Sequence, residues 1–255
     1  MTEPIFHVAG MTEYRLRRFY SEVMSRLGFT PHTVRAQGAR FVVDTGDFID
    51  CCIAWYGLWE GDQLERLAIL ARERKIDVFL DIGANTGFYS VMFAVKKLAG
   101  RVIAFEPDPG NHARLMANLN ANGLVGRVEA MPFALGDREG EVTLYEGARG
   151  NRGESTIAVP EQTPRDVTFS VRQAAFDSQF DISGATMIVK MDVEGYEFEA
   201  LAGMERTLRN NQCFIQVEHY GERGEDLKAQ MAGYGYRYLD TRHIDLYFTN
   251  MPDVS

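Results

Sequence analysis

The sequence predicts a doubly wound α/β fold with a mostly parallel sheet. Short apolar runs alternate with stretches of helical length through the middle and C-terminal parts of the chain. A glycine-rich turn at residues 83–87 separates the first of these runs from the helix behind it. Alternation of this kind indicates parallel strands with helices on both faces of the sheet. The last two apolar runs are joined by a short turn alone, so they should pair antiparallel.

The N-terminal region contributes helical and hairpin elements. Apolar residues recur every three to four positions over residues 11–27 and predict a helix. Residues 33–43 predict a hairpin, and residues 60–75 a second helix. We interpret residues 1–60 as an addition that does not fold independently, and residues 61–255 as the main domain.

The main domain should contain a seven-stranded sheet that ends in an antiparallel strand. The predicted strands are residues 78–80, 101–105, 128–131, 187–191, 214–217, 236–239 and 245–248. The predicted helices among them are residues 88–98, 109–121 and 196–209.

Residues 138–185 interrupt this alternation. The segment is rich in glycine and proline and includes strand-like pieces at residues 141–145 and 167–171. We interpret it as an insertion above the sheet, where substrate-selecting elements of such folds lie.

Composition excludes several classes of protein. The 255 residues are 45% hydrophobic and 25% charged, which is ordinary for a globular protein. A net charge of -9 disfavours a nucleic-acid partner, because an acidic surface repels phosphates. No segment approaches the roughly 20 consecutive apolar residues of a membrane span.

The N-terminus and the cysteines indicate a cytoplasmic location. The first ten residues lack the basic and apolar regions of a secretory signal. The three cysteines, two of them adjacent, form neither a disulfide framework nor a zinc-binding pattern. A reducing compartment is therefore expected.

The glycine-rich turn is the strongest functional signal. Residues 79–90 place an apolar strand, then Asp81, then the G-x-N-x-G sequence Gly83, Asn85 and Gly87, ahead of an apolar helix. Glycines let the backbone approach a ligand closely, and a helix N-terminus offers free N–H groups to a carboxylate or phosphate. A turn of this kind without a ligand is the structural alternative.

A carboxylate at the end of the next strand defines the ligand further. Glu106 ends that strand and can accept both hydroxyls of an adenosine ribose. Dinucleotide enzymes require G-x-G-x-x-G around a pyrophosphate, whereas Asn85 occupies the second glycine position here. The pattern favours S-adenosylmethionine (SAM), which has no pyrophosphate. A nicotinamide-dependent oxidoreductase remains the alternative.

A second block of polar residues follows a later strand. Lys190, Asp192 and Glu194 alternate, so on an extended strand their side chains point to one side. They should gather at the carboxyl edge of the sheet, where open α/β folds bind ligands. The alternative is a polar strand end followed by a helix cap.

These motifs together resemble the FkbM family of SAM-dependent methyltransferases. The resemblance spans roughly residues 55–220 and rests on six segments, which are residues 56–60, 81–87, 105–108, 134–137, 155–156 and 190–197. It implies a class I, Rossmann-like SAM methyltransferase fold. It also implies methyl transfer, most often to a hydroxyl of a sugar, a glycan or a glycosylated natural product, with N-methylation as an alternative.

The resemblance also implies roles for individual residues. The glycine turn would line the methionine part of SAM, Glu106 would hold the ribose, and residues 135–137 would lie against the adenine. The full expected cofactor set is Glu60, Asp81, Gly83, Ala84, Asn85, Gly87, Phe88, Glu106, Pro107, Leu135, Gly136 and Asp137.

Methylation of a hydroxyl calls for a general base or a metal ion. The candidates are Asp192, Glu194, Glu218 and His219, which follow two neighbouring predicted strands. His219 has a reference pKa of about 6.5, suited to a base near neutrality, although a histidine at a strand end is often structural. A divalent metal is possible but not favoured. The sequence identifies neither the acceptor, a small molecule or glycan, nor the oligomeric state.

Overall fold

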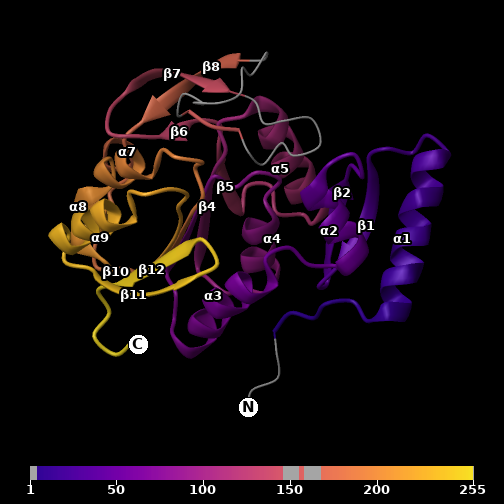
Figure 1. Ribbon diagram of the computed structural model, residues 1–255, viewed down its shortest axis with the longest axis horizontal. Helices are drawn as coiled ribbons and strands as arrows, with labels where there is room; N and C mark the ends of the chain where they lie inside the picture. The colour runs from indigo at the N-terminus through magenta and orange to yellow at the C-terminus, as the bar shows by residue number, and fades with distance from the viewer. Residues whose placement is uncertain (1–4, 146–154, 158–167, 255) are drawn as a thin grey trace.

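The computed structural model describes residues 5–145, 155–157 and 168–254 (Figure 1). Its main sheet has seven strands in the order β11-β12-β10-β9-β3-β4-β5. β12 is antiparallel to both of its neighbours and the other pairs are parallel, which confirms the predicted sheet. The strands are β3 (Val78–Ile82), β4 (Arg101–Phe105), β5 (Val128–Met131), β9 (Thr186–Met191), β10 (Gln212–Glu218), β11 (Arg237–Arg242) and β12 (Asp245–Thr249).

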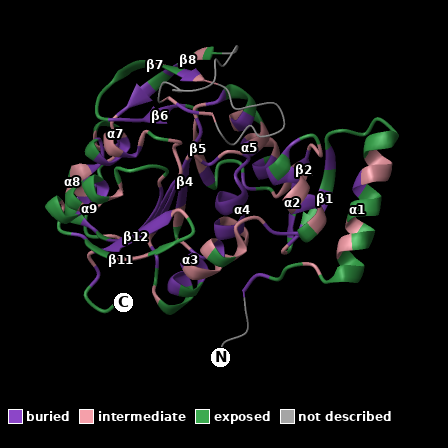
Figure 2. Cartoon of the chain, viewed as in Figure 1, coloured by how far each residue is buried: buried purple, intermediate pink, exposed green. Residues whose placement is uncertain are grey.

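The central strands are apolar and buried on both faces (Figure 2). Phe79, Ile188 and Phe214 face one apolar cluster, and Leu80, Val189 and Ile215 face the other, since successive residues of a strand point to opposite sides. The first cluster includes residues of α3 (Gly61–Glu73), α4 (Phe88–Val95) and α5 (Pro109–Ala121). The second includes residues of α6 (Phe176–Gln179), α7 (Glu197–Ala202), α8 (Glu205–Asn210) and α9 (Gly224–Gly233).

The order of the strands creates a crevice at the carboxyl ends of β3 and β9. From β3 the chain builds outward through β4 and β5, and it then returns to β9 on the other side of β3. Ligands of doubly wound folds bind at such a reversal.

The N-terminal region contains α1 (Met11–Arg26), β1 (His32–Ala36), β2 (Ala39–Val43) and α2 (Phe48–Tyr56). The helix and the hairpin confirm the sequence predictions, whereas α2 was not predicted. The Asp47 carboxylate caps α2 by accepting from two of its backbone N–H groups. The hairpin is joined to α5, because the side chain of Asn118 accepts a hydrogen bond from the N–H of Val42 at 2.7 Å. The domain boundary at about residue 60 stays a prediction.

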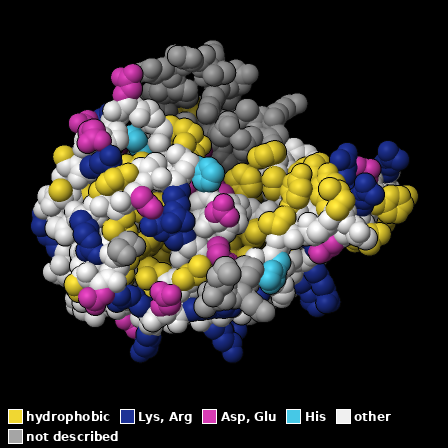
Figure 3. All heavy atoms as spheres, turned by 60° about the horizontal axis from the view of Figure 1, so that its bottom comes forward, with side chains coloured by type: hydrophobic (Ala, Val, Ile, Leu, Met, Phe, Trp, Pro, Cys, Tyr) yellow, Lys and Arg dark blue, Asp and Glu magenta, His cyan; other side chains and the backbone are white. Residues whose placement is uncertain are grey.

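The apolar residues that predict α1 are largely exposed. Leu16, Phe19 and Leu27 are 66%, 67% and 66% exposed, and Ser21 is the buried residue of the helix. Hydrophobic side chains accordingly gather near the right-hand end of the molecule in Figure 3. No helix of the described ranges is both long and apolar enough to cross a bilayer.

A second, three-stranded sheet follows β5. It consists of β6 (Ala134–Leu135), β7 (Gly140–Tyr145) and β8 (Thr168–Ala174), in the order β6-β8-β7. A Cβ at Gly203 would lie 1.8 Å from the carbonyl oxygen of Gly136, so the end of β6 packs main chain to main chain on the turn between α7 and α8. Residues 146–154 and 158–167 of the expected insertion lie outside the described residues.

The helix predicted over residues 196–209 is two helices. α7 ends at Ala202 and α8 begins at Glu205, with Gly203 at the break. The close approach of Gly136 at Gly203 explains why this turn carries no side chain.

Candidate active site

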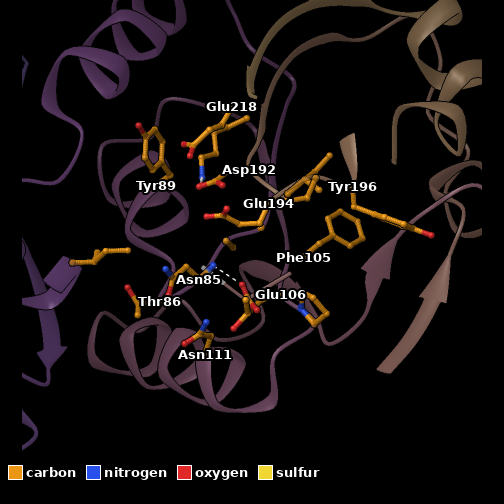
Figure 4. Close-up of a pocket in the computed structure, with 18 of the residues that line it drawn as sticks. Asn85, Thr86, Tyr89, Phe105, Glu106, Asn111, Asp192, Glu194, Tyr196 and Glu218 are labelled. Atoms are coloured by element: carbon orange, nitrogen blue, oxygen red, sulfur yellow. Dashed lines mark hydrogen bonds and ion pairs between the residues drawn. The ribbon is translucent and has the colours of Figure 1, made fainter. Parts of the chain in front are cut away.

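A cavity of about 410 Å³ lies at the carboxyl ends of β3, β4, β9 and β10. Figure 4 shows Asn85 and Glu106 toward one side of it and Tyr89, Asp192 and Glu218 toward the other, with Glu194 between them. The two sides have different chemistry. The Glu106 end comprises Gly83, Ala84, Asn85, Glu106 and Pro107, and the Lys190 end comprises Glu60, Tyr89, Lys190, Asp192, Glu218 and Asp245.

Glycine is required at position 83 by two features of the backbone. Its φ of 77° lies in the left-handed region, and a Cβ there would lie 1.7 Å from the carbonyl oxygen of Asp192. The N–H groups of Gly83 and Ala84 donate to the carbonyl of Phe105 at 3.0 and 2.9 Å. The glycine turn is thereby held between the ends of β4 and β9.

Glu106 is fixed by main-chain donors. Its carboxylate accepts from the N–H of Asn85 at 2.6 Å and from the N–H of Asp108 at 2.9 Å. Burial raises the pKa of Glu106 to about 8, although these two N–H groups act in the opposite direction. The carboxylate is therefore positioned by the backbone and lines the cavity.

Asn85 adds a polar atom without a protein partner in the described structure. Its side-chain Oδ1 is buried and accepts no hydrogen bond there, while its backbone has a φ of 51°. A buried acceptor of this kind usually has a partner in the working protein. Asn85 thus marks the Glu106 end as a place for a polar ligand.

Two other residues of the glycine motif act on the structure behind the cavity. Asp81 accepts from the N–H and the hydroxyl of Ser90 at 3.0 and 2.6 Å, and it is buried against the first turn of α4. A Cβ at Gly87 would lie 2.2 Å from the side chain of Leu115 on α5. Neither Asp81 nor Gly87 lines the cavity.

The Lys190 end is a group of carboxylates around a buried ammonium. Lys190 Nζ lies 2.9 Å from the carboxylate of Asp192 and 5.3 Å from the centre of the Tyr89 ring. The Tyr89 hydroxyl donates to Glu60 at 2.8 Å. Burial alone would lower the pKa of Lys190, but the surrounding carboxylates, Asp192 and Glu60 first among them, make the net shift upward.

Two carboxylates of this end, Glu218 and Glu60, are strong proton acceptors. Burial, then the neighbouring Asp192, raises the pKa of Glu218 to about 8, and Lys190 opposes the shift. Burial likewise raises the pKa of Glu60 to about 7, again against Lys190. Groups with pKa values in this range exchange protons near neutral pH, as a general base must.

The same carboxylates have the spacing of a metal site. Oxygen atoms of Glu60, Asp192 and Glu218 lie within 4.8 Å of one another. Hard divalent cations bind such oxygens, but Asp192 already pairs with the ammonium of Lys190. A site without a metal, which the sequence favours, stays a prediction.

The structure brings most of the expected site residues to the cavity. Those that line it are Glu60, Gly83, Ala84, Asn85, Phe88, Glu106, Pro107, Leu135, Asp192, Glu194 and Glu218. Glu60, expected beside the cofactor, lies instead with the catalytic candidates at the Lys190 end.

Three further expected residues do not line the cavity. Gly136 lies behind it, where its missing side chain leaves room for Gln173, and Gln173 in turn accepts from the Tyr196 hydroxyl at 2.7 Å. Asp137 lies 3.6 Å from Arg138, with a side chain 40% exposed.

His219 is the third expected residue that does not line the cavity. Its side chain is turned toward Glu197 on α7, with 3.2 Å between Nδ1 and Oε2. It follows Glu218, and neighbouring residues of an extended chain point to opposite sides, so one of the two faces the cavity.

Several lining residues were not predicted from the sequence. Tyr89 and Asp245 belong to the Lys190 end, and Gln63 lies next to Asp245. Asp245 is the first residue of β12, a strand whose apolar pattern indicated only its place in the sheet. Asp245 could have been predicted only from the antiparallel pairing of β12 with β10, which places the start of β12 beside the carboxyl end of β10.

Comparison with known proteins identifies the family. A family model described as a methyltransferase FkbM domain matches residues 81–238. The chain belongs to the FkbM methyltransferase family. The match favours the methyltransferase prediction over the nicotinamide-dependent alternative.

Individual proteins agree with this assignment at low identity. The hexuronic acid methyltransferase AglP of Haloferax volcanii is 24% identical over 169 residues, which are 66% of this chain and 66% of AglP. The 2-O-methyltransferase NoeI of Sinorhizobium fredii is 24% identical over 171 residues, 62% of this chain and 69% of NoeI. The chain therefore matches about two thirds of the length of these relatives.

The fold agrees with a solved FkbM structure. The crystal structure of methyltransferase FkbM from Methylobacillus flagellatus matches with a TM-score of 0.50 and 16% identity, over 91% of this chain and 70% of that chain. This supports the class I, Rossmann-like methyltransferase fold expected from the sequence.

Proposed function

We propose that this FkbM methyltransferase uses SAM to methylate a hydroxyl of a sugar, in a small molecule or a glycan. The observation that carries the proposal is the cavity that joins a main-chain-fixed carboxylate, Glu106, to a group of buried proton acceptors, Glu60 and Glu218. The sugar acceptor is supported by two relatives, one named for hexuronic acid and one for 2-O-methylation.

The Glu106 end fits SAM. The Glu106 carboxylate suits the two ribose hydroxyls, and Pro107 and Leu135 offer apolar surface to the adenine. The buried Oδ1 of Asn85 is an acceptor for the ammonium of the methionine part. When bound, SAM supplies a methyl group on a sulfonium, activated for displacement.

The Lys190 end provides what the acceptor needs. A hydroxyl is a poor nucleophile until its proton is taken, and we assign this proton to Glu218, with Asp192 held in place by Lys190. Trp59 and Tyr220 also line the cavity and offer aromatic faces to a sugar ring. Glu194 lies between the two ends (Figure 4).

The test is binding of S-adenosylhomocysteine, measured by calorimetry with NADH as the parallel ligand and with each run repeated in Mg²⁺. We expect micromolar binding of S-adenosylhomocysteine alone and no change with Mg²⁺. Binding of NADH in its place would refute the proposal. A dependence on Mg²⁺ would move Glu60, Asp192 and Glu218 from proton acceptors to metal ligands.

A cytoplasmic location remains part of the proposal. It is supported by the three cysteines, Cys51, Cys52 and Cys213, none of which forms a disulfide in the described structure.

A further inference from the structure

A sugar offers two kinds of oxygen to a methyl donor. A hydroxyl is neutral, must lose a proton, and gives an ether. The carboxylate of a uronic acid is already charged, has no proton to lose, and gives an ester. The side chains at the Lys190 end distinguish between these two acceptors.

The cavity carries a large excess of carboxylates. Its described lining includes one lysine and no arginine, against the acidic residues Glu60, Glu106, Asp192, Glu194, Glu218 and Asp245. The ammonium of Lys190 is already paired with Asp192 at 2.9 Å and lies over the Tyr89 ring. Once Glu218 is ionised, as a base must be, a carboxylate entering this end would therefore meet like charges, while the one lysine of the described lining is already paired, at a large cost in a buried site.

Asp245 strengthens this exclusion. It is 2% exposed, and it accepts from the side-chain amides of Gln216 at 2.9 Å and of Gln63 at 3.4 Å. Amide N–H groups are the neutral donors that would otherwise receive an acceptor carboxylate. Because Asp245 accepts one N–H from each of these amides, the cavity wall presents a hydrogen-bond acceptor at this position.

The presence of a buried base also favours a hydroxyl as the methyl acceptor. In methylation of a hydroxyl, an oxygen lone pair forms the new bond to the methyl carbon and the carbon–sulfur electron pair stays on sulfur. The hydroxyl proton then passes to the carboxylate of Glu218. A carboxylate acceptor needs no such base, so the buried group around Glu218 would serve no purpose for it.

We propose that the Lys190 end accepts uncharged sugar hydroxyls and rejects sugars that carry a carboxylate, so that this chain differs in acceptor from the relative named for hexuronic acid, with Asp245 as a specificity-determining residue. The inference rests on the proposed methyltransferase function. It predicts ether products and a sharp difference between a neutral sugar and its uronate.

The test uses three acceptors that differ only at carbon 6, the carbon attached to the sugar ring. They are p-nitrophenyl β-glucoside, the corresponding glucuronide, and the methyl ester of that glucuronide. With methyl-labelled SAM we expect kcat/KM for the glucuronide to be at least tenfold below both neutral sugars. Equal turnover of the glucuronide, or label on it that mild alkali removes as an ester would, overturns the inference.

Asp245→Asn tests the specificity residue. We expect the ratio of glucuronide to glucoside kcat/KM to rise at least fivefold. Asp226→Asn is the matched control, because it removes the same charge from a side chain 65% exposed on α9 and should leave the ratio unchanged. Equal ratios in the two variants would show that Asp245 does not determine the specificity.

Failure of the inference is distinguishable from failure of the proposed function. A protein that binds S-adenosylhomocysteine but transfers methyl only to the glucuronide contradicts the inference and leaves the function standing. A protein that binds S-adenosylhomocysteine but methylates none of the three overturns the inference for hexoses. Lack of S-adenosylhomocysteine binding contradicts the function itself.

Discussion

The two ends of the cavity hold their carboxylates in different ways. At the Glu106 end, the carboxylate is fixed by two backbone N–H groups, and the turn beside it depends on a glycine that leaves room for the carbonyl of Asp192. At the Lys190 end, carboxylates from the start of α3, the end of β9 and the end of β10 balance the charge of one ammonium on β9. The first end is local in sequence and rigid, whereas the second depends on one buried cation.

Loss of that cation should have the largest effect. Lys190→Met leaves the half-buried Asp192 and Glu60 without their counter-charge, and we expect the free energy of unfolding to fall by about 3 kcal/mol. Urea denaturation measures it. Lys228→Met, which breaks an exposed pair with Glu225, should cost about 1 kcal/mol or less. Similar losses in both variants would show that the Lys190 end is not held by its charge balance.

A side chain at position 83 should disturb both ends at once. Gly83→Ala adds a Cβ onto the Asp192 carbonyl, and overpacking and left-handed strain together cost about 3 kcal/mol. We also expect S-adenosylhomocysteine binding to be lost. Gly123→Ala separates the two causes, because Gly123 has a φ of 65° but no atom within 4 Å of its Cβ position. Equal destabilisation would leave strain as the sole cause.

Glu218→Gln should affect the Lys190 end alone. We expect kcat to fall at least about a hundredfold while binding of S-adenosylhomocysteine is retained. In the unchanged protein, burial raises the pKa of Glu218 to about 8, and a base must be unprotonated. The kcat should therefore rise with pH up to about 8 and then level off, and the variant should lose this rise. Glu222→Gln, at an exposed residue of the loop after β10, should keep this rise.

Glu106→Ala should affect the Glu106 end, and its expected effect is the smallest of the four substitutions. We expect the affinity for S-adenosylhomocysteine to fall more than tenfold, about 1.4 kcal/mol, with the fold intact. Calorimetry measures the affinity, and circular dichroism the fold. Glu129→Ala removes a half-exposed carboxylate that pairs with Arg101 outside the cavity, and should leave the affinity unchanged. An unchanged affinity in folded Glu106→Ala would place the ribose elsewhere.

The same difference explains what the sequence could predict. The Glu106 end was predicted because its residues follow two strands directly, in one motif. Tyr89 and Asp245 were not, because one lies in an apolar helix and the other begins an apolar strand, and only the folded chain brings them together. His219 was expected at the cavity from its place at a strand end, but alternation of side chains turns Glu218 there and His219 toward Glu197.

The secondary structure was likewise predicted where it depends on local sequence and missed where it depends on distant residues. The strands of the main sheet were predicted because buried parallel strands are continuous apolar runs. α2 was missed, because nine mostly apolar residues without helical periodicity do not distinguish a helix from a strand. The break at Gly203 was missed because it depends on Gly136, far away in the sequence.

The contact between Gly136 and Gly203 limits how this enzyme can be re-engineered. Because no side chain separates the two backbones, the three-stranded sheet packs on the turn between α7 and α8 in one fixed position. A chimera that takes β6, β7 and β8 from another methyltransferase must therefore bring a matching turn with it. Acceptor range would then be exchanged as a two-part module, one part on each side of residues 190–197 in the sequence.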